Sequence, residues 1–231
     1  MIPKIIHYCW FGRNPLPQKA RKCIESWKKY CPEYQIIEWN EDNFDVHMNG
    51  YTEMCIRENK WAFLSDYVRL LVLFREGGVY FDVDVELVRP IEDLLQNSSY
   101  FGFETNKYVN TGLGFGAEAG NSVLKQMIAE YDRLLDGEHG VVGCPTLNTE
   151  ALVKCGLVLN GQKQKLDGAV VYPAEYFNPY DDPTGRLNVT ENTYSIHWYF
   201  KSPHNKATII RSKLMRPVHR LFGTDFFRRR K

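Results

Sequence analysis

The chain has 231 residues, 44% of them apolar and 14% aromatic, and a formal net charge of +1. This composition predicts a folded globular protein with a substantial core, and it excludes a disordered or low-complexity chain. The charge is unevenly spread, because residues 205–231 carry +8 and residues 1–204 therefore carry −7. We predict one globular domain over 1–204 and a basic tail over 205–231.

The apolar segments do not predict a membrane-spanning or secreted protein. The longest uninterrupted apolar run covers residues 70–74, whereas a bilayer requires about 20 residues. His7 interrupts the apolar residues near the N-terminus, so we expect no signal peptide. Six cysteines without a C-x-x-C spacing predict reduced thiols rather than disulfides or zinc ligands. We therefore expect a cytoplasmic protein.

The hydrophobic periodicity predicts strands and helices that alternate along the chain. In the first half of the chain we predict a strand at 4–10, a helix at 17–30, a strand at 34–39, two helical stretches ending at residue 76, and a strand at 79–85. In the second half we predict a short helix after residue 90, strands at 100–104 and 112–117, helices at 122–135 and 146–154, and strands at 170–172 and 194–199. Such alternation predicts an α/β fold, with a mainly parallel sheet and helices on both faces. Ligands of these sheets bind beyond the carboxyl ends of the strands.

The predicted strand at 79–85 carries two acidic residues, Asp82 and Asp84. Side chains alternate along a strand, so both carboxylates point to the same face. Two like charges on so apolar a strand repel each other and lose hydration. A divalent cation near both would relieve these costs; a solvated acidic face on an edge strand is the alternative interpretation.

The helix before this strand carries a charged pair, Asp66 and Arg69. Residues three apart are neighbours on one helix face, so an ordinary intrahelical ion pair is the simplest interpretation. The helix is apolar nearly all round, however, which predicts that the pair is partly buried and has a ligand. The short turn at Gly77-Gly78 then places Asp66, Arg69 and the two aspartates in one neighbourhood.

These motifs make the chain recognisable. Residues 63–95 read FLSDYVRLLVLFREGGVYFDVDVELVRPIEDLL, which resembles the DXD-containing core of glycosyltransferase family 32. Residues 2–44 resemble the first strand, helix and second strand of the same family, and the match continues loosely through VNTGLGFGAEAGN to SIHWYFKS. The family includes capsular-polysaccharide sugar transferases, yeast mannosyltransferases and the glucosylating domains of large clostridial toxins. The resemblance implies the GT-A fold, a single Rossmann-like domain.

The resemblance also implies a set of catalytic and metal-binding residues. Asp84 matches the position that binds the metal directly, and Asp82 matches the one that contacts the ribose and supports the metal. His197, near the C-terminus, is the candidate third ligand, although a lone histidine on an aromatic strand is often a core residue. Asp66 and Arg69 match positions that hold the donor sugar and the diphosphate. A histidine with carboxylates would suit Mn²⁺ at least as well as Mg²⁺.

Five further residues are candidates for contacts with the nucleotide sugar. Trp10 matches the aromatic residue that stacks on the base of a UDP-sugar, although a core tryptophan is an equal alternative. Tyr80 is expected near the ribose, and Asn110 near the sugar or the acceptor. Trp198 and Lys201 are expected to close over the diphosphate.

The implied function is metal-dependent hexose transfer from a nucleotide sugar, with a UDP-sugar as the expected donor and retention at the anomeric carbon. The expected acceptor is a saccharide or lipid-linked saccharide in surface or capsular polysaccharide synthesis. Two alternatives remain open: a metal-dependent nucleotide-sugar phosphohydrolase, and a non-catalytic carbohydrate-binding or scaffold protein with the same fold. Metal-dependent nucleotide binding separates the scaffold from the enzymes, and acceptor-dependent release of diphosphate separates the transferase from the hydrolase.

The basic tail predicts a contact with an anionic surface. Apolar residues from Ile209 to Phe222 fall roughly on one helical stripe, which Pro217 divides, and residues 226–231 read FFRRRK. A peripheral anchor on the inner face of the membrane is one interpretation, and a helix packed on the domain with a solvated basic end is the other. No recognition motif accompanies the tail, so we expect no nucleic-acid partner.

Overall fold

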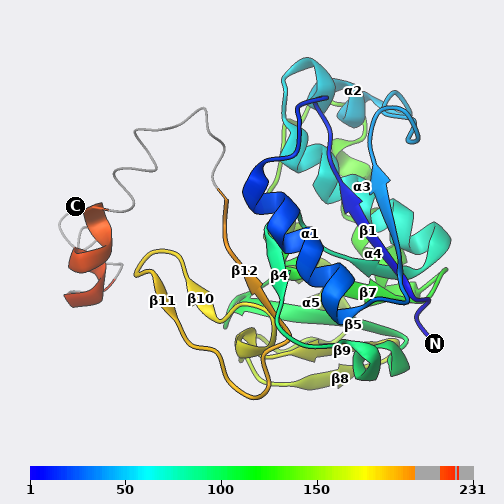
Figure 1. The fold of residues 1–231 in the computed structure, drawn as a ribbon. Coiled ribbons are helices and arrows are strands. Elements are labelled where there is room, and N and C mark those ends of the chain that lie inside the picture. The colour runs from blue at the N-terminus through cyan, green and yellow to red at the C-terminus, as the bar shows by residue number, and fades with distance from the viewer. Residues whose placement is uncertain (201–213, 222, 224–231) are drawn as a thin grey trace, which may run out of the picture.

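The computed structural model describes residues 1–200, 214–221 and 223 of the chain (Figure 1). The predicted ligand Lys201 and most of the predicted tail lie outside the described residues. The described helices are α1 (Gln18–Tyr30), α2 (Gly50–Arg57), α3 (Trp61–Glu76), α4 (Ser122–Ala129), α5 (Cys144–Lys154) and a short helix over 214–221. The strands are β1 (Ile5–Cys9), β2 (Gln35–Trp39), β3 (Gly78–Tyr80), β4 (Val85–Leu87), β5 (Ser99–Thr105), β6 (Tyr108–Val109), β7 (Phe115–Ala117), β8 (Gln164–Leu166), β9 (Ala169–Tyr172), β10 (Tyr180–Asp181), β11 (Arg186–Leu187) and β12 (Ser195–His197).

One mixed sheet forms the centre of the fold. Its strand order is β2-β1-β3-β7-β5-β9-β8, and β6 pairs with β5. Strands β2, β1, β3, β5 and β9 run in one direction, and β7 and β8 run in the other. The carboxyl ends of β1, β3 and β5 therefore meet at the same edge of the sheet. The predicted α/β class with a mainly parallel sheet is confirmed.

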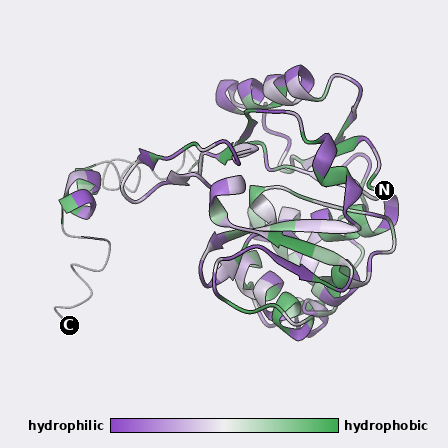
Figure 2. Cartoon of the chain, turned by 90° about the horizontal axis from the view of Figure 1, so that it is seen from below, coloured by the Kyte–Doolittle hydropathy of each residue, from purple (hydrophilic) through white to green (hydrophobic). Residues whose placement is uncertain are grey.

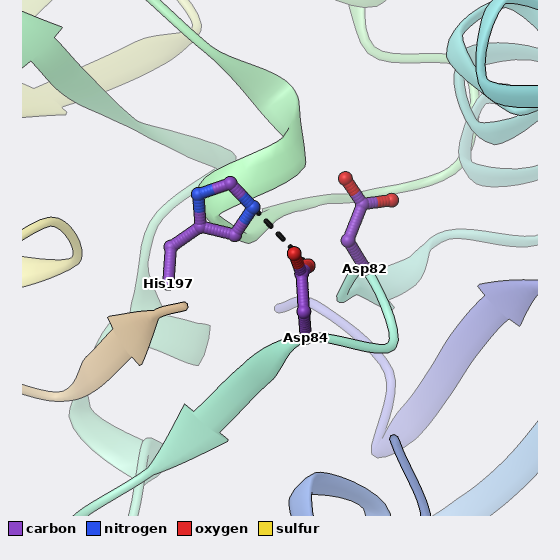
Figure 3. Close-up of side chains that lie close together, drawn as sticks. All are labelled: Asp82, Asp84 and His197. Atoms are coloured by element: carbon purple, nitrogen blue, oxygen red, sulfur yellow. Dashed lines mark ion pairs between the residues drawn. The ribbon is translucent and has the colours of Figure 1, made fainter. Parts of the chain in front are cut away.

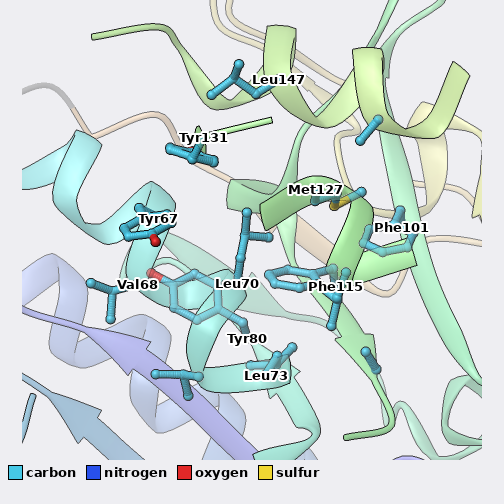
Figure 4. Packing of buried hydrophobic residues seen from close by; sticks show 14 of the residues in the cluster. Tyr67, Val68, Leu70, Leu73, Tyr80, Phe101, Phe115, Met127, Tyr131 and Leu147 are labelled. Carbon is cyan, nitrogen blue, oxygen red and sulfur yellow. The ribbon is translucent and has the colours of Figure 1, made fainter. Parts of the chain in front are cut away.

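Two hydrophobic cores cover the two faces of the sheet. Along β3, Val79 faces the core beside α1, whereas Tyr80 faces the core beside α3, α4 and α5. On the second face, Leu70 of α3 and Phe115 of β7 lie beside the Tyr80 ring, and Met127 of α4 packs in the same core (Figure 4). Figure 2 shows the hydrophobic residues gathered in the strands between outer helices with hydrophilic faces. The prediction of helices on both faces is confirmed.

Helix α1 is fastened to the strand that follows the acidic motif. Trp27 is fully buried, and its indole N–H donates to the Val85 carbonyl at 2.7 Å. The Trp27 ring also packs on Phe81, at 5.5 Å between ring centroids. Both contacts hold α1 against the segment between β3 and β4, so the acidic motif has a rigid support on this side.

Three predicted elements differ from the structure. The strand predicted at 79–85 is two strands, β3 and β4, separated by a turn in which the Val85 N–H donates to the Asp82 carbonyl at 3.0 Å. The strand predicted at 112–117 begins as a 3₁₀ turn (Thr111–Leu113), because Gly114 takes a φ of 110° and turns the chain before β7. The helix predicted at 122–135 is α4 followed by a 3₁₀ turn at Asp132–Leu134.

All six cysteines are free thiols. Within residues 1–200 and 214–221, no helix is both long and apolar enough to cross a bilayer.

His7 is a buried polar residue that joins β1 to the turn between α3 and β3. The indole N–H of Trp39 donates to His7 Nδ1 at 3.0 Å, so Nε2 carries the proton and donates to the Gly77 carbonyl at 3.0 Å. Burial lowers the pKa of His7 to about 4. A side chain on Gly78 would collide with this ring, which requires glycine there.

We predict that His7 makes the folded state sensitive to acid. The unfolded state binds a proton near pH 6.5 and the folded state only near pH 4, so stability falls as the pH is lowered through this window. The full loss is about 3 kcal/mol of unfolding free energy. Denaturant titrations at several pH values should show a smaller loss in His7→Gln than in the wild type. Equal pH dependence in the two proteins would contradict the prediction.

Candidate functional site

The acidic motif lies in the turn at the carboxyl end of β3, beside the end of β1. Asp82 and Asp84 are therefore presented by a turn and not by the middle of a strand, which corrects the sequence-based prediction. The correction has a local cause, since the hydrogen bond from Val85 to Asp82 curls the chain between the two residues. Both side chains nevertheless reach the same space (Figure 3).

His197 joins the two aspartates through a long-range strand pair. Strand β12 runs antiparallel to β4, with His197 opposite Val85. His197 Nε2 lies 3.1 Å from Asp84 Oδ1, as the dashed line in Figure 3 marks. The backbone N–H groups of Trp198 and Phe200 donate to the Asp84 carbonyl and to Asp84 Oδ2, at 2.9 and 2.8 Å. Strand β12 and the residues that follow it thus hold Asp84 in place from one side.

The three side chains form a donor set that fits a divalent cation. Asp82, Asp84 and His197 each offer one ligand atom, and these atoms lie within 4.8 Å of one another. Two carboxylate oxygens and an imidazole nitrogen suit Mn²⁺, and the carboxylates also suit Mg²⁺. The residues present therefore fit the metal that the family resemblance implies.

Burial and neighbouring charges shift the pKa values of these three groups in different directions. Burial raises the pKa of Asp82 to about 6, although the Arg69 charge opposes it. Burial acts in the same direction on Asp84, but the charge and hydrogen bond of His197 outweigh it, so the pKa of Asp84 is lowered. For His197, the Asp84 charge outweighs burial and raises the pKa. Because protons compete with a cation for these atoms, we expect cation binding to weaken in acid.

A buried arginine supports the acidic turn from the α3 side. Arg69 Nη2 lies 2.5 Å from Asp66 Oδ1 and 3.3 Å from Asp82 Oδ1, and its guanidinium stacks on Tyr80. The Tyr80 hydroxyl donates to Asp82 Oδ1 at 2.9 Å. The Arg69 side chain is only 3% exposed, so its guanidinium is buried between the Asp66 and Asp82 carboxylates. The predicted neighbourhood of Asp66, Arg69, Asp82 and Asp84 is present.

The segment after β6 closes another side of the site. The Asn110 side chain accepts from the Gly112 N–H at 2.7 Å, and Gly112 lies so close to Asp82 that a Cβ would come within 2.6 Å of Asp82 Oδ2. Helix α5 supports this segment, since Cys144 Sγ lies 3.4 Å from Asn110 Oδ1 and Asn148 donates to Thr111 at 2.9 Å. Sequence reasoning missed Cys144 and Asn148, whose only signal is their spacing of four on a helix.

The other candidate ligands lie around these groups at different depths. Trp10 follows β1, is half-buried, and donates its indole N–H to the Asn14 carbonyl at 2.5 Å. Trp198 is half-buried and bonds to Glu86. Tyr80 is fully buried, and its hydroxyl donates to Asp82 Oδ1. Lys201 is outside the described residues.

Comparisons with known proteins show similarity to glycosyltransferases. Residues 17–101 match the family model described as the glycosyltransferase sugar-binding region containing DXD motif. The chain is 24% identical over 142 residues to inositol phosphoceramide mannosyltransferase 3 of Schizosaccharomyces pombe, covering 60% of this chain and 39% of that protein. It is 24% identical over 128 residues to the initiation-specific alpha-1,6-mannosyltransferase of Candida albicans, covering 51% and 32%. Each match spans well under half of the relative's own length.

A solved structure supports the fold. The PaToxG glycosyltransferase superposes with a TM-score of 0.53 at 21% identity, covering 66% of this chain and 69% of that one, which shows the predicted GT-A fold. The match over 17–101 includes Asp82-Val83-Asp84, which has the DXD pattern. Residues 17–101 are therefore similar to the sugar-binding region of glycosyltransferases that contain a DXD motif.

Proposed function

We propose that the chain is a metal-dependent, retaining glycosyltransferase that moves a hexose from a UDP-sugar to a saccharide or lipid-linked saccharide, as in capsular polysaccharide synthesis. The convergence of Asp82, Asp84 and His197 carries the proposal, because a binding module has no need of a site for a metal and a diphosphate. Two similar proteins are named mannosyltransferases, one of them acting on inositol phosphoceramide, which supports hexose transfer and a lipid-attached acceptor.

The proposed mechanism follows from the charge of the leaving group. Release of a nucleoside diphosphate places growing negative charge on the phosphate. A divalent cation, which Asp84 and His197 would hold, would supply Lewis-acid stabilisation of that charge. Arg69 and Tyr80 hold the Asp82 carboxylate in place, and the backbone of Trp198 and Phe200 holds Asp84. In a front-face reaction the leaving phosphate oxygen takes the acceptor proton, so no carboxylate base is required.

We predict that Asp84→Asn abolishes transfer and weakens metal-dependent nucleotide binding while the protein stays folded. Asparagine has the same shape and still accepts the Phe200 N–H, but it is a poor ligand for a divalent cation. Calorimetric titration of UDP in the presence of Mn²⁺ should show at least about a hundredfold weaker binding. The exposed Asp167→Asn, in the turn before β9, is the matched control and should bind as the wild type. Normal transfer by Asp84→Asn would defeat the metal-site assignment.

We also predict that Trp10 stacks on the base of the donor. Base–aromatic stacking contributes roughly 1–3 kcal/mol, so Trp10→Ala should weaken UDP binding by about tenfold or more, whereas Trp10→Phe should retain most of it. Both variants are measured by titration of UDP in the presence of Mn²⁺. Tight binding of a GDP- or CMP-sugar by the wild type, with no binding of UDP, would contradict the choice of donor.

The described part of the tail supports a membrane role for the rest. The helix over 214–221 lies against the β10–β11 hairpin, where Arg216 Nη2 is 3.1 Å from Asp182 Oδ1 and 2.6 Å from the Tyr180 hydroxyl. Its apolar residues Leu214 and Leu221 are 71% and 77% exposed. We propose that this helix and the FFRRRK end anchor the enzyme on the anionic inner face of a membrane, near a lipid-linked acceptor.

We predict that the intact protein co-sediments with anionic lipid vesicles at low salt and is released at high salt. Each basic residue near such a surface contributes about 1 kcal/mol, so truncation after Gly223 should remove most of the binding and spare activity on a soluble acceptor. A variant with Arg228, Arg229 and Arg230 changed to Gln keeps both phenylalanines and separates charge from insertion. Equal vesicle binding by the truncated and intact proteins would exclude the anchor.

A further inference from the structure

Three polar side chains lie beside the site without a part in the proposed chemistry. The Tyr199 hydroxyl is 2.9 Å from Glu104 Oε1 and 3.1 Å from Asn178 Oδ1, and Asn178 Nδ2 donates to the Glu104 carbonyl at 3.1 Å. We call these residues the Glu104 cluster. They come from the end of β5, from the loop before β10 and from the segment after β12 (Figure 1).

The backbone at Tyr199 is held in an unfavourable conformation. Its φ is +51°, in the left-handed region that bulky residues rarely adopt. On either side of it, the N–H groups of Trp198 and Phe200 are bonded to Asp84. The chain thus turns sharply between two bonds to one aspartate, and the turn directs the Tyr199 side chain to Glu104. Strain of this kind accumulates at functional sites.

The Glu104 cluster is next to the metal ligands. The Tyr199 ring lies 4.1 Å from the His197 ring, measured between centroids. Glu104 is half-buried, and in the described part of the chain Oε1 accepts the Tyr199 hydrogen bond while Oε2 has no protein donor. One oxygen is therefore fixed and the other is free for a ligand.

The strand order determines where the Glu104 carboxylate lies relative to the proposed donor site. In the sheet the strands follow the order β1, β3, β7, β5, and β1, β3 and β5 end at the same edge. Trp10 follows β1, Asp82 and Asp84 follow β3, and Glu104 is near the end of β5. A donor with its base at Trp10 and its diphosphate at the aspartates therefore extends its sugar towards β5. Glu104 lies where the sugar would meet its acceptor.

We propose that Glu104 binds hydroxyl groups of the acceptor sugar, and that Tyr199 and Asn178 are positioning residues that hold its carboxylate. The inference rests on the proposed transferase function and names its acceptor subsite. A carboxylate accepts up to four hydrogen bonds, so a glutamate fixed through one oxygen suits a hydroxyl-bearing ring. Glu104 forms no covalent bond in this role, and the acceptor proton still leaves with the phosphate.

The test separates acceptor binding from donor binding. Wild type, Glu104→Gln and Tyr199→Phe are assayed for release of UDP from a UDP-hexose with a panel of p-nitrophenyl hexopyranosides as acceptors. Because hydrogen bonds to a charged group are the strong ones, Glu104→Gln should raise the acceptor KM by about tenfold or more. Tyr199→Phe keeps the charge and loses the fixing bond, so it should raise the acceptor KM less. In both variants the Kd for UDP with Mn²⁺ should stay within about twofold of the wild type.

Glu33→Gln, which removes a surface ion pair with Lys4 before β2, is the matched control and should change neither constant. An unchanged acceptor KM in Glu104→Gln, or a UDP affinity that falls as much as transfer does, would overturn the inference alone. If Glu104→Gln does not fold, the Tyr199→Phe measurement decides, with an unchanged acceptor KM counting against the inference. If no glycoside stimulates UDP release by the wild type, the transferase proposal fails and this inference fails with it.

Discussion

The site depends on the antiparallel pairing of β12 with β4. These strands are more than a hundred residues apart in the sequence, yet their register places His197 opposite Val85 and next to Asp84. The same pairing lets two backbone N–H groups reach Asp84. Without it, Asp82 and Asp84 would be two aspartates in a turn with no third candidate ligand beside them. The central sheet places the two aspartates at the carboxyl end of β3, and the two-stranded sheet of β4 and β12 brings His197 beside them.

The charges of the buried site residues are only partly balanced by one another. With its carboxylates ionised, the group of Asp66, Asp82 and Asp84 against Arg69 carries −2 when His197 is neutral. Burying unbalanced charge is costly, and Arg69 compensates only part of it because its guanidinium is shared between Asp66 and Asp82. A protonated His197 would compensate one more charge, and a divalent cation would compensate both. The charge of Asp84 accordingly raises the pKa of His197.

Local reasoning about the sequence reached one half of the site and missed the other. Asp66, Arg69 and the two aspartates lie within one helix–turn segment, so helical spacing and the Gly77-Gly78 turn were enough to bring them together. The prediction of one strand at 79–85 was wrong. Its β-branched and aromatic residues favour an extended chain, but the Val85 N–H donates to the Asp82 carbonyl and forms a turn within the segment. His197 was predicted from the family resemblance alone, since nothing in its local pattern distinguishes a ligand from a core residue.

The residues that sequence reasoning could not find are those that depend on tertiary packing. Glu104, Asn178 and Tyr199 come from three elements, and their contacts appear only once the strands are ordered in the sheet. The positive φ of Tyr199 has no sequence signal, because a glycine or asparagine would be expected there. Hydrogen bonds between distant parts of the chain, such as these, cannot be predicted from the hydrophobic periodicity of the sequence.

The C-terminal segment also connects the site to the tail. Trp198 packs on Tyr180 of the β10–β11 hairpin, at 5.2 Å between ring centroids, and the Tyr180 hydroxyl receives a hydrogen bond from Arg216 at 2.6 Å. The helix over 214–221 therefore rests on the same hairpin that supports the residue after His197. Because truncation after Gly223 leaves these contacts in place, it removes the basic end without disturbing the support of the site. The proposed membrane attachment can then be tested separately from the proposed transfer reaction.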